Sequence, residues 1–164
     1  TRKESSAASD VYKRQSQAGV LVKASNKEIQ SYNDLADKKV ATQAGSTGPA
    51  ILAQYAPKAV VQEFQTHQEA LNGLRQGRVD AYVTDQTLLL NVLSLGGSEA
   101  RLAGAPFGAQ DPYGIGLPKG SDGVAFVNAF LKKLEADGTW AKLWTVSIGQ
   151  RTGSTDVPTP PSIP

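Results

Sequence analysis

The chain has 164 residues and no cysteine, which excludes disulfide bonds and thiol chemistry. Four of the 17 basic and two of the 15 acidic residues lie within residues 1–15, so the rest of the chain is formally neutral and offers no case for a nucleic-acid partner. The sequence contains no run of 18 apolar residues, the length that a membrane-spanning helix needs.

The first residues of the chain differ in character from the rest. Residues 5–15 read SSAASDVYKRQ and show neither the apolar repeat of a strand nor that of a helix. The stretch resembles, residue for residue, the translation of the transposon adapter used to prepare short-read sequencing libraries. A basic tail for nucleic acid is the alternative interpretation. We therefore expect residues 1–15 to be a non-native, disordered segment and the chain to be an N-terminally truncated fragment that resumes at Ser16.

Short strands and short helices alternate along the middle of the chain. Two capping boxes, Ser31 with Asp34 and Thr66 with Glu69, mark helix starts. Strands are predicted over residues 18–24, 38–43, 59–64, 78–85 and 100–107, and helices over residues 31–38, 44–56, 66–77 and 86–97. This alternation predicts an α/β fold of βαβ units with a parallel-type sheet and flanking helices.

The C-terminal part of the chain has a different pattern. Residues 111–123 predict a strand and a turn, and the helix that follows carries apolar residues at i, i+3, i+4 and i+7, namely Val127, Phe130, Leu131 and Leu134. From residue 150 the sequence is polar and rich in proline, which predicts an extended, unpacked tail.

A glycine-rich turn, QAGSTG at residues 43–48, leads from a predicted strand into a predicted helix. Ligand sites in α/β sheets lie at the carboxyl ends of strands, and a helix N-terminus favours an anion. The turn lacks the lysine and the glycine spacing of phosphate-binding loops. A carboxylate therefore suits it better, with Ser46 and Thr47 as additional hydroxyl donors. An ordinary capped helix after a tight turn remains the alternative.

Asp85 ends another predicted strand and follows Thr84. A carboxylate at that place can accept charge-assisted hydrogen bonds from a ligand ammonium group. The alternative is that Asp85 only caps the helix that follows. A carboxylate-binding turn and an ammonium-binding aspartate at neighbouring strand ends would together fit an α-amino acid.

His67, the single histidine, is predicted to be a surface residue in the first turn of a helix rather than a catalytic group. With no second histidine or cysteine, the sequence offers no metal cluster and no cysteine–histidine pair. We expect no catalytic residue, no metal site and no cofactor.

Three segments together resemble one protein family. DLADKKVATQAGSTG, EALNGLRQGRVDAYVTDQ and DPYGIGLPKGSDGVAFVNAFLKKLEADGTWAKLW are similar to the polar amino-acid-binding proteins of bacterial ABC importers, solute-binding protein family 3. The family has a periplasmic-binding-protein-like (type II) fold of two α/β lobes. The resemblance then implies this division of the chain: a crossover strand at 16–23, a complete second lobe at 24–105, a crossover with the C-terminal strand and helices of an incomplete first lobe at 106–149, and a disordered tail at 150–164.

The resemblance also implies roles for individual residues. Asp85 would bind the α-ammonium group, Thr47 with Gly45 and Ser46 would meet the α-carboxylate, and Gln43 and Thr84 would touch the ligand side chain. The proline-rich tail is similar to that of glutamate-binding members, so glutamate is the favoured ligand.

The implied protein is a monomeric, extracytoplasmic receptor, periplasmic or anchored at the cell surface, that delivers its amino acid to a membrane permease and is not an enzyme. A dehydratase on the same fold and the ligand-sensing domain of a receptor are the alternatives.

Overall fold

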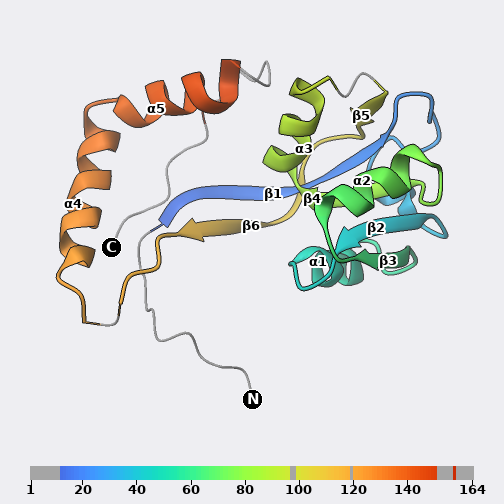
Figure 1. Cartoon of the computed structure of the whole chain (residues 1–164), viewed down its shortest axis with the longest axis horizontal. Helices are drawn as coiled ribbons and strands as arrows, with labels where there is room; N and C mark the ends of the chain where they lie inside the picture. Colours follow the sequence, from blue (N-terminus) through green and yellow to red (C-terminus); the bar gives the residue numbers. More distant parts are fainter. Residues whose placement is uncertain (1–11, 97–98, 119, 151–156, 158–164) are drawn as a thin grey trace. The chain divides into compact units, whose positions relative to one another are not determined.

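Strands and helices alternate as the sequence predicts in the computed structural model, which describes residues 12–96, 99–118, 120–150 and 157 (Figure 1). The chain divides into a compact unit of residues 17–109 and a second unit formed by the remaining described residues. The elements of the first unit are β1 (Tyr12–Lys23), η1 (Tyr32–Leu35), β2 (Lys39–Gln43), α1 (Gly48–Tyr55), β3 (Val60–Phe64), α2 (His67–Arg75), β4 (Ala81–Asp85), α3 (Gln86–Ser94) and β5 (Ala100–Leu102).

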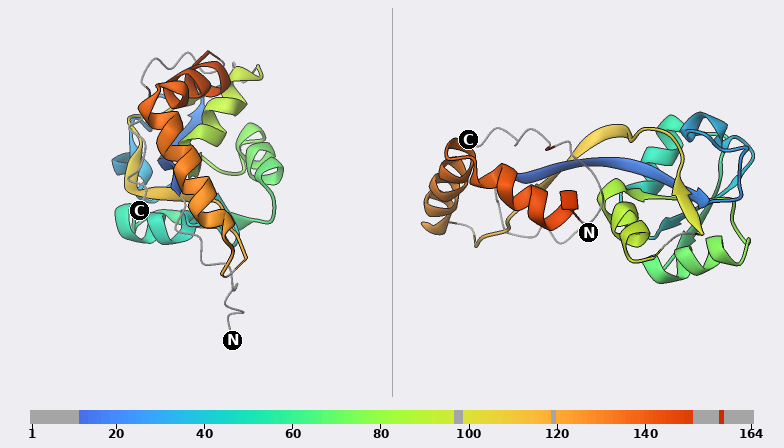
Figure 2. Two further views of the ribbon diagram at one scale, coloured as in Figure 1. Left: turned by 90° about the vertical axis from the view of Figure 1, so that its left-hand side faces the viewer. Right: turned by 90° about the horizontal axis from the view of Figure 1, so that it is seen from above.

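The sheet of the first unit has the strand order β3-β2-β4-β1-β5. Strand β2 is parallel to both of its neighbours, β3 and β4, which confirms the predicted α/β class. Strand β1 lies between β4 and β5 and is antiparallel to both, a feature that the alternation of elements does not predict. Strand β6 (Phe107–Gly114) pairs with β1, and the two run side by side (Figures 1 and 2).

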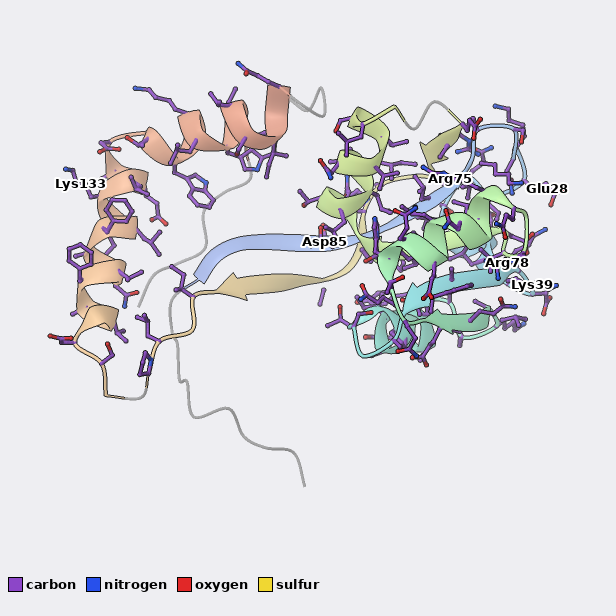
Figure 3. All side chains as sticks on the ribbon, viewed as in Figure 1. Glu28, Lys39, Arg75, Arg78, Asp85 and Lys133 are labelled. Carbon is purple, nitrogen blue, oxygen red and sulfur yellow. The ribbon has the colours of Figure 1, made fainter. Side chains whose placement is uncertain are left out.

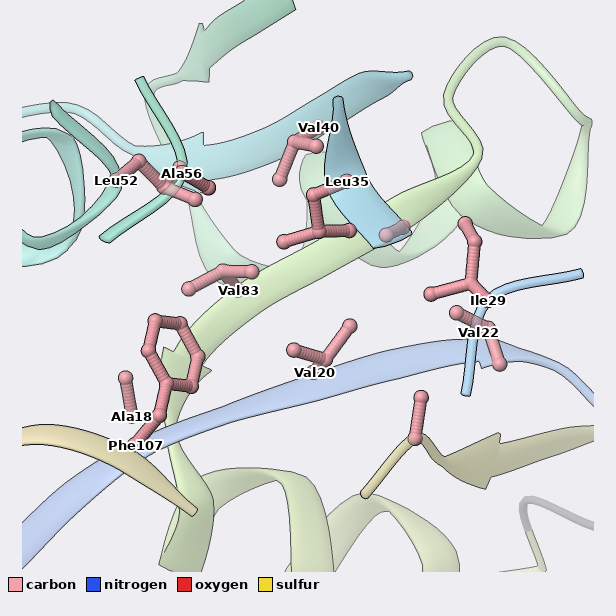
Figure 4. Packing of buried hydrophobic residues seen from close by; sticks show 12 residues of the cluster. Ala18, Val20, Val22, Ile29, Leu35, Val40, Leu52, Ala56, Val83 and Phe107 are labelled. Carbon is pink, nitrogen blue, oxygen red and sulfur yellow. The ribbon is translucent and has the colours of Figure 1, made fainter. Parts of the chain in front are cut away.

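Two apolar layers sandwich this sheet because side chains alternate along each strand. On one face, Val20, Val22, Val40 and Val83 pack under η1 and α1 and against Phe107 (Figure 4). On the other face, α2 and α3 cover a second layer whose buried members include Leu21, Ala41, Leu71, Leu74, Tyr82 and Leu89. The sheet is therefore closed on both faces, and ligand access is left to its edges.

Local sequence explains where the helices begin. Both predicted capping boxes are present: Ser31 with Asp34 begins η1, and Thr66 with Glu69 begins α2. Gly77, which follows α2, has φ +74°, a conformation that glycine adopts without strain.

The second unit contains α4 (Gly123–Ala136), α5 (Thr139–Trp144) and the π-helical turn η2 (Thr145–Gly149). Of the predicted apolar face of α4, Leu131 is buried, whereas Phe130 keeps 51% of its surface exposed. Phe126, Leu143 and Val146 are exposed as well. The helices of this unit therefore carry much apolar surface in contact with solvent.

The structure describes only parts of the two terminal segments, residues 1–15 and 150–164, that were predicted to be disordered. Strand β1 begins at Tyr12, so residues 12–15, which were expected to be disordered, belong to a strand. Residues 1–11 lie outside the described residues. In the predicted tail, Gln150 caps η2 and Val157 is exposed, while the other tail residues are also outside the described part. The division into two lobes stays a prediction.

Candidate functional site

The glycine-rich turn forms a tight connection between β2 and α1. Gly45 has φ +71°, and a Cβ atom there would meet nothing within 4 Å. The Ser46 hydroxyl donates to the carbonyl of Gln43 at 2.7 Å and accepts from the amide of Gly48 at 3.2 Å. Gly45, Ser46 and Thr47 are exposed. The turn is therefore exposed at the carboxyl end of β2, and the Ser46 amide and hydroxyl both donate within it to the Gln43 carbonyl.

The start of α1 differs in one detail from the sequence expectation. Thr47 occupies the N-cap position, but its side chain does not make the capping hydrogen bond, and Ser46 bonds the first helical amide instead. Pro49 lies in the first turn, where its missing N–H costs nothing. The N-terminus of α1 points its amides and the positive end of its dipole toward the exposed turn, which suits an anion.

Asp85 is the last residue of β4 and the N-cap of α3. Its Oδ1 accepts a hydrogen bond from the amide of Thr87 at 2.6 Å, so the capping interpretation of this residue is confirmed. The capping bond fixes the orientation of the carboxylate at the strand end (Figure 3). A capping role and a ligand-binding role are compatible, because the cap holds the carboxylate in a defined position.

Strand pairing brings the two clusters to one edge of the sheet. Strands β2 and β4 are parallel neighbours, with Ala41 opposite Tyr82. Gln43 ends β2 and Asp85 ends β4, so the two clusters of predicted site residues lie at the carboxyl ends of neighbouring parallel strands. Asp85 lies at the opposite end of this unit from Glu28, Lys39 and Arg78 (Figure 3).

The surroundings of His67 contradict the prediction that it is a simple surface residue. The ring is half-buried at the start of α2, and its Nδ1 lies 2.8 Å from the hydroxyl of Tyr82, a side chain with no exposed surface. Burial lowers the pKa of His67 and raises that of Tyr82, and a hydrogen bond from the Thr84 side chain lowers the latter in part.

Sequence reasoning missed Tyr82, although one signal pointed to it. In the strand AYVTD, Tyr82 and Thr84 are two residues apart and therefore share a face of the sheet. A tyrosine on the buried face of a strand needs a hydrogen-bond partner, and the polar residue two positions later is one candidate.

A cavity of about 500 Å³ lies at the far edge of the sheet, where β1 ends. Its lining includes Leu21, Lys23, Leu71, Leu74, Arg75 and Val92 and none of the predicted site residues. Among the residues that the structure describes, none of the acidic, histidine or cysteine side chains form a group that could hold a metal ion. Within that same part of the chain, no helix is both long and apolar enough to cross a membrane.

Proteins with similar sequences are named for the binding of amino acids. The chain is 36% identical over 138 residues to the ABC transporter glutamine-binding protein GlnH of Bacillus subtilis, covering 83% of this chain and 49% of GlnH. It is 31% identical to the glutamate-binding protein GluB of Corynebacterium glutamicum, covering 80% of this chain and 46% of that protein. The relatives of this chain are amino-acid-binding proteins of ABC transporters. The chain spans about half the length of these curated relatives.

Solved structures show the same fold. An ancestral arginine-binding protein bound to glutamine matches with a TM-score of 0.69 at 31% identity, over 87% of this chain and 63% of that one. The ancestral amino-acid-binding protein AncCDT-1, described as a precursor of cyclohexadienyl dehydratase, matches with a TM-score of 0.69 at 30% identity, over 82% of this chain and 59% of that one. No family model matches the chain.

Proposed function

We propose that this chain is part of the solute receptor of an ABC-type amino-acid importer. The proposal rests on one observation: two clusters lie at the same edge of the sheet, and they suit ligand groups of opposite charge. The turn at Gly45–Thr47 with the N-terminus of α1 suits an anion, and the carboxylate of Asp85 suits a cation. An α-amino acid carries both charges on one carbon atom, so a single small ligand can satisfy both clusters.

Each site residue has a defined role in this proposal. The α-carboxylate meets Thr47, with Gly45 and Ser46, at the N-terminus of α1, and a hydrogen bond from the Ser46 hydroxyl to it would replace the one that this hydroxyl donates to Gln43. The α-ammonium group donates to Asp85. Gln43 and Thr84, at the ends of neighbouring strands, contact the ligand side chain. These residues bind and orient the ligand and carry out no covalent chemistry.

The ligand is proposed to be a polar amino acid, with glutamate as the first candidate and its amide glutamine as the second. The sequence resemblance favours glutamate, and the relatives are named for both. Glutamate and glutamine have side chains of the same length. Either side chain would place its polar end near Gln43 and Thr84.

The transport role follows from the same proposal. Ligand binding would close two lobes, and a membrane permease would recognise the closed form. The receptor would be a monomer outside the cytoplasm, in the periplasm or anchored at the cell surface, without a cofactor or a nucleic-acid partner. Residues 24–105 would be the second lobe, and residues 106–149 would belong to the first.

A titration of the ¹⁵N-labelled chain by NMR tests the binding proposal, because this method detects weak binding. Glutamate, glutamine and arginine would be added separately, with the dipeptide alanyl-alanine as a control that has its carboxylate and ammonium groups on different carbon atoms. We expect shifts of the amides of Gly45–Gly48 and of Thr84–Thr87 with at least one amino acid and not with the dipeptide. Binding that leaves these amides unchanged would contradict the proposed site.

A dehydratase is the second candidate, because one structural neighbour is described as a precursor of such an enzyme. Asp85 is the acid that this alternative would use. Incubation with a cyclohexadienyl substrate and detection of the aromatic product would distinguish the two functions. Turnover that is lost in Asp85→Asn would favour the enzyme over the receptor.

A further inference from the structure

The cavity at the end of β1 has a buried apolar floor and an exposed polar rim. Its volume of about 500 Å³ lies within the range of roughly 300–1,000 Å³ that small-molecule sites in proteins have. Its floor includes Leu21, Leu71 and Leu74, each of which is at most 5% exposed. Arg75 and Glu99 are exposed and belong to the rim. A ligand in this cavity would therefore meet apolar atoms at the floor and charged groups at the rim.

The cavity forms because α2 and α3 pack on different strands of the sheet. Helix α2 packs mainly on β2, β3 and β4, whereas α3 packs mainly on β4 and β5. Strand β1 lies between β4 and β5, and the pairing of Lys23 with Ala100 joins β1 to β5 where the cavity lies. Arg75 from the last turn of α2 and Val92 from α3 complete this part of the lining. Four elements of the fold therefore build the cavity.

Two cationic side chains line the cavity, and neither has a partner within the part of the chain that the structure describes. No ion pair or side-chain hydrogen bond there involves Lys23 or Arg75. Lys23 is half-buried, and its Nζ would lie 3.3 Å from a Cβ atom at Gly77, the residue that ends the turn after α2. An ammonium group carries three donors and a guanidinium group five. These donors can therefore be offered to a ligand.

The C-terminal ends of α2 and α3 lie beside these cations but do not use their donors. The carbonyl end of a helix attracts positive charge. In the last turn of α2, however, the Leu74 carbonyl accepts from the amide of Gly77, and after α3 the Leu93 carbonyl accepts from the amide of Gly96. The helix ends thus weaken the positive field in the cavity without replacing a ligand as the acceptor.

Glu99 limits the charge that a ligand can carry. Among the described lining residues, the two basic side chains of Lys23 and Arg75 and the one acidic side chain of Glu99 leave a net formal charge of +1. A ligand with a single negative charge balances this lining, whereas a phosphate monoester, which carries nearly two, exceeds it. A carboxylate also matches the fork of a guanidinium group with two parallel hydrogen bonds.

We propose that this cavity is a second binding site, which takes a small carboxylate with an apolar body. The carboxylate accepts hydrogen bonds from Arg75 and Lys23, and the apolar body lies against the leucines of the floor and the partly buried Val92. A free amino acid suits this site poorly, because its ammonium group would lie beside two cations. The inference goes beyond the proposed receptor function and does not depend on it.

The cavity and the proposed amino-acid site lie at opposite ends of β4. Lys23 ends β1, which is antiparallel to β4 and pairs Val22 with Ala81, the first residue of β4. Asp85 is the last residue of β4, and four residues of strand span about 13 Å. Arg75 and Asp85 are also apart in Figure 3. A ligand in the cavity and an amino acid at Asp85 therefore do not compete for the same atoms.

The test is an NMR titration of the ¹⁵N-labelled whole chain with hexanoate as the probe. We expect hexanoate to shift the amides of residues 23–25 and 71–75 and to leave those of residues 45–48 and 84–87 in place. Three further probes separate the contributions: hexan-1-ol lacks the charge, acetate lacks the apolar body, and hexylammonium reverses the charge. Each should bind at least about tenfold more weakly than hexanoate.

Two results of this titration would overturn the inference. One is that hexanoate leaves the amides of residues 23–25 and 71–75 unchanged at millimolar concentration. The other is that hexylammonium binds as tightly as hexanoate, because the cations would then play no part. Failure of the proposed receptor function looks different, since the chain would then bind hexanoate but no amino acid.

Arg75→Gln is the first variant, because Arg75 is exposed and glutamine forms helices about as well as arginine. We expect it to weaken hexanoate binding about tenfold, and Lys23→Gln to do the same. Lys39→Gln is the matched control, since Lys39 is exposed, carries the same charge and does not line the cavity. Equal losses in all three variants would overturn the site, because only net charge would then matter. If Lys23→Gln does not fold, the comparison of Arg75→Gln with Lys39→Gln decides.

Discussion

The hydroxyl of Thr42 occupies the space into which a side chain at Gly48 would extend. A Cβ atom built on Gly48 overlaps Thr42 Oγ1. Thr42 is fully buried near the end of β2, and its hydroxyl has no hydrogen-bond partner among the described residues. The close approach brings the first turn of α1 directly onto the strand, and it therefore determines where the end of that helix that we propose to bind an anion lies.

We predict that Gly48→Ala destabilises the chain by about 2 kcal/mol, the usual cost of overpacking a buried contact. The measurement is the free energy of unfolding in urea. Thr42→Ala is the matched background, since removing the hydroxyl removes the overlap. In that background the same glycine substitution should cost much less, and equal costs in both backgrounds would contradict the contact.

The two roles of Asp85 can be separated by substitution. Asn caps a helix about as well as Asp, so Asp85→Asn should keep the stability of the wild type. Asp85→Ala loses the cap and should lower the free energy of unfolding by about 1 kcal/mol. Both variants remove the charge that would face the ligand ammonium group and should weaken amino-acid binding by about 1.5–3 kcal/mol.

Thermal denaturation and an NMR titration of the same samples give both quantities for these Asp85 variants. Binding by Asp85→Asn with wild-type affinity would show that the residue is a helix cap only. Reduced binding in both variants together with reduced stability in Asp85→Ala alone is the expected pattern.

The buried environment of His67 makes stability depend on pH. Its pKa is lower in the folded chain than the ordinary 6.5, so the unfolded chain binds more protons between those two values. Stability should therefore fall as pH decreases from about 6.5 toward the folded pKa, and level off below it.

His67→Gln should remove this part of the pH dependence, measured as the urea midpoint in steps across the range. The carboxyls of Asp34 and Glu28 also have lowered pKa values, but their ordinary values are 3.8 and 4.5, so they act at lower pH. A wild-type midpoint that rises as pH falls through 6.5 would contradict the buried neutral histidine.

Arg101 holds the loop after β1 against β5. Its Nη2 donates to the carbonyls of Asn26 at 2.7 Å and Ile29 at 2.8 Å, and Nε donates to Asn26 at 3.2 Å. Lysine cannot reproduce this fork, so Arg101→Lys should lower the free energy of unfolding by about 2 kcal/mol.

Hydrogen exchange provides a local measurement of the same loop. In Arg101→Lys the amides of residues 26–31 should exchange faster, whereas Arg75→Lys on the exposed surface of α2 should leave them unchanged. Unchanged exchange in both variants would show that the loop is held by other contacts.

The local parts of the fold could be predicted from the sequence because their causes are local. The capping boxes at Ser31 and Thr66 depend on residues three positions apart, and both are present in the structure. The position of β1 could not be predicted in this way. Its pairing joins Ala18 to Asp85, residues far apart in sequence, and only packing in three dimensions selects an antiparallel neighbour there.

The places of the candidate residues in the fold were predicted to the same extent, while their roles in binding stay a prediction. Strand ends and a glycine turn pointed to Gly45 and Asp85, because a turn after a strand is a local signal. The contact between His67 and Tyr82 was missed, since the burial of Tyr82 and the position of His67 beside it depend on how α2 packs on the sheet. A residue such as His67 looks like a surface residue until the helix is placed.

The two ends of the 17–109 unit meet each other. The Gln17 side chain donates to the carbonyl of Gly108 at 2.8 Å, and β1 and β6 are paired neighbours. A module whose two ends are adjacent can be spliced into a surface loop of an unrelated host without stretching either protein. Inserted in this way into a fluorescent protein, residues 17–109 would join the proposed amino-acid site to the host through a single pair of neighbouring strands.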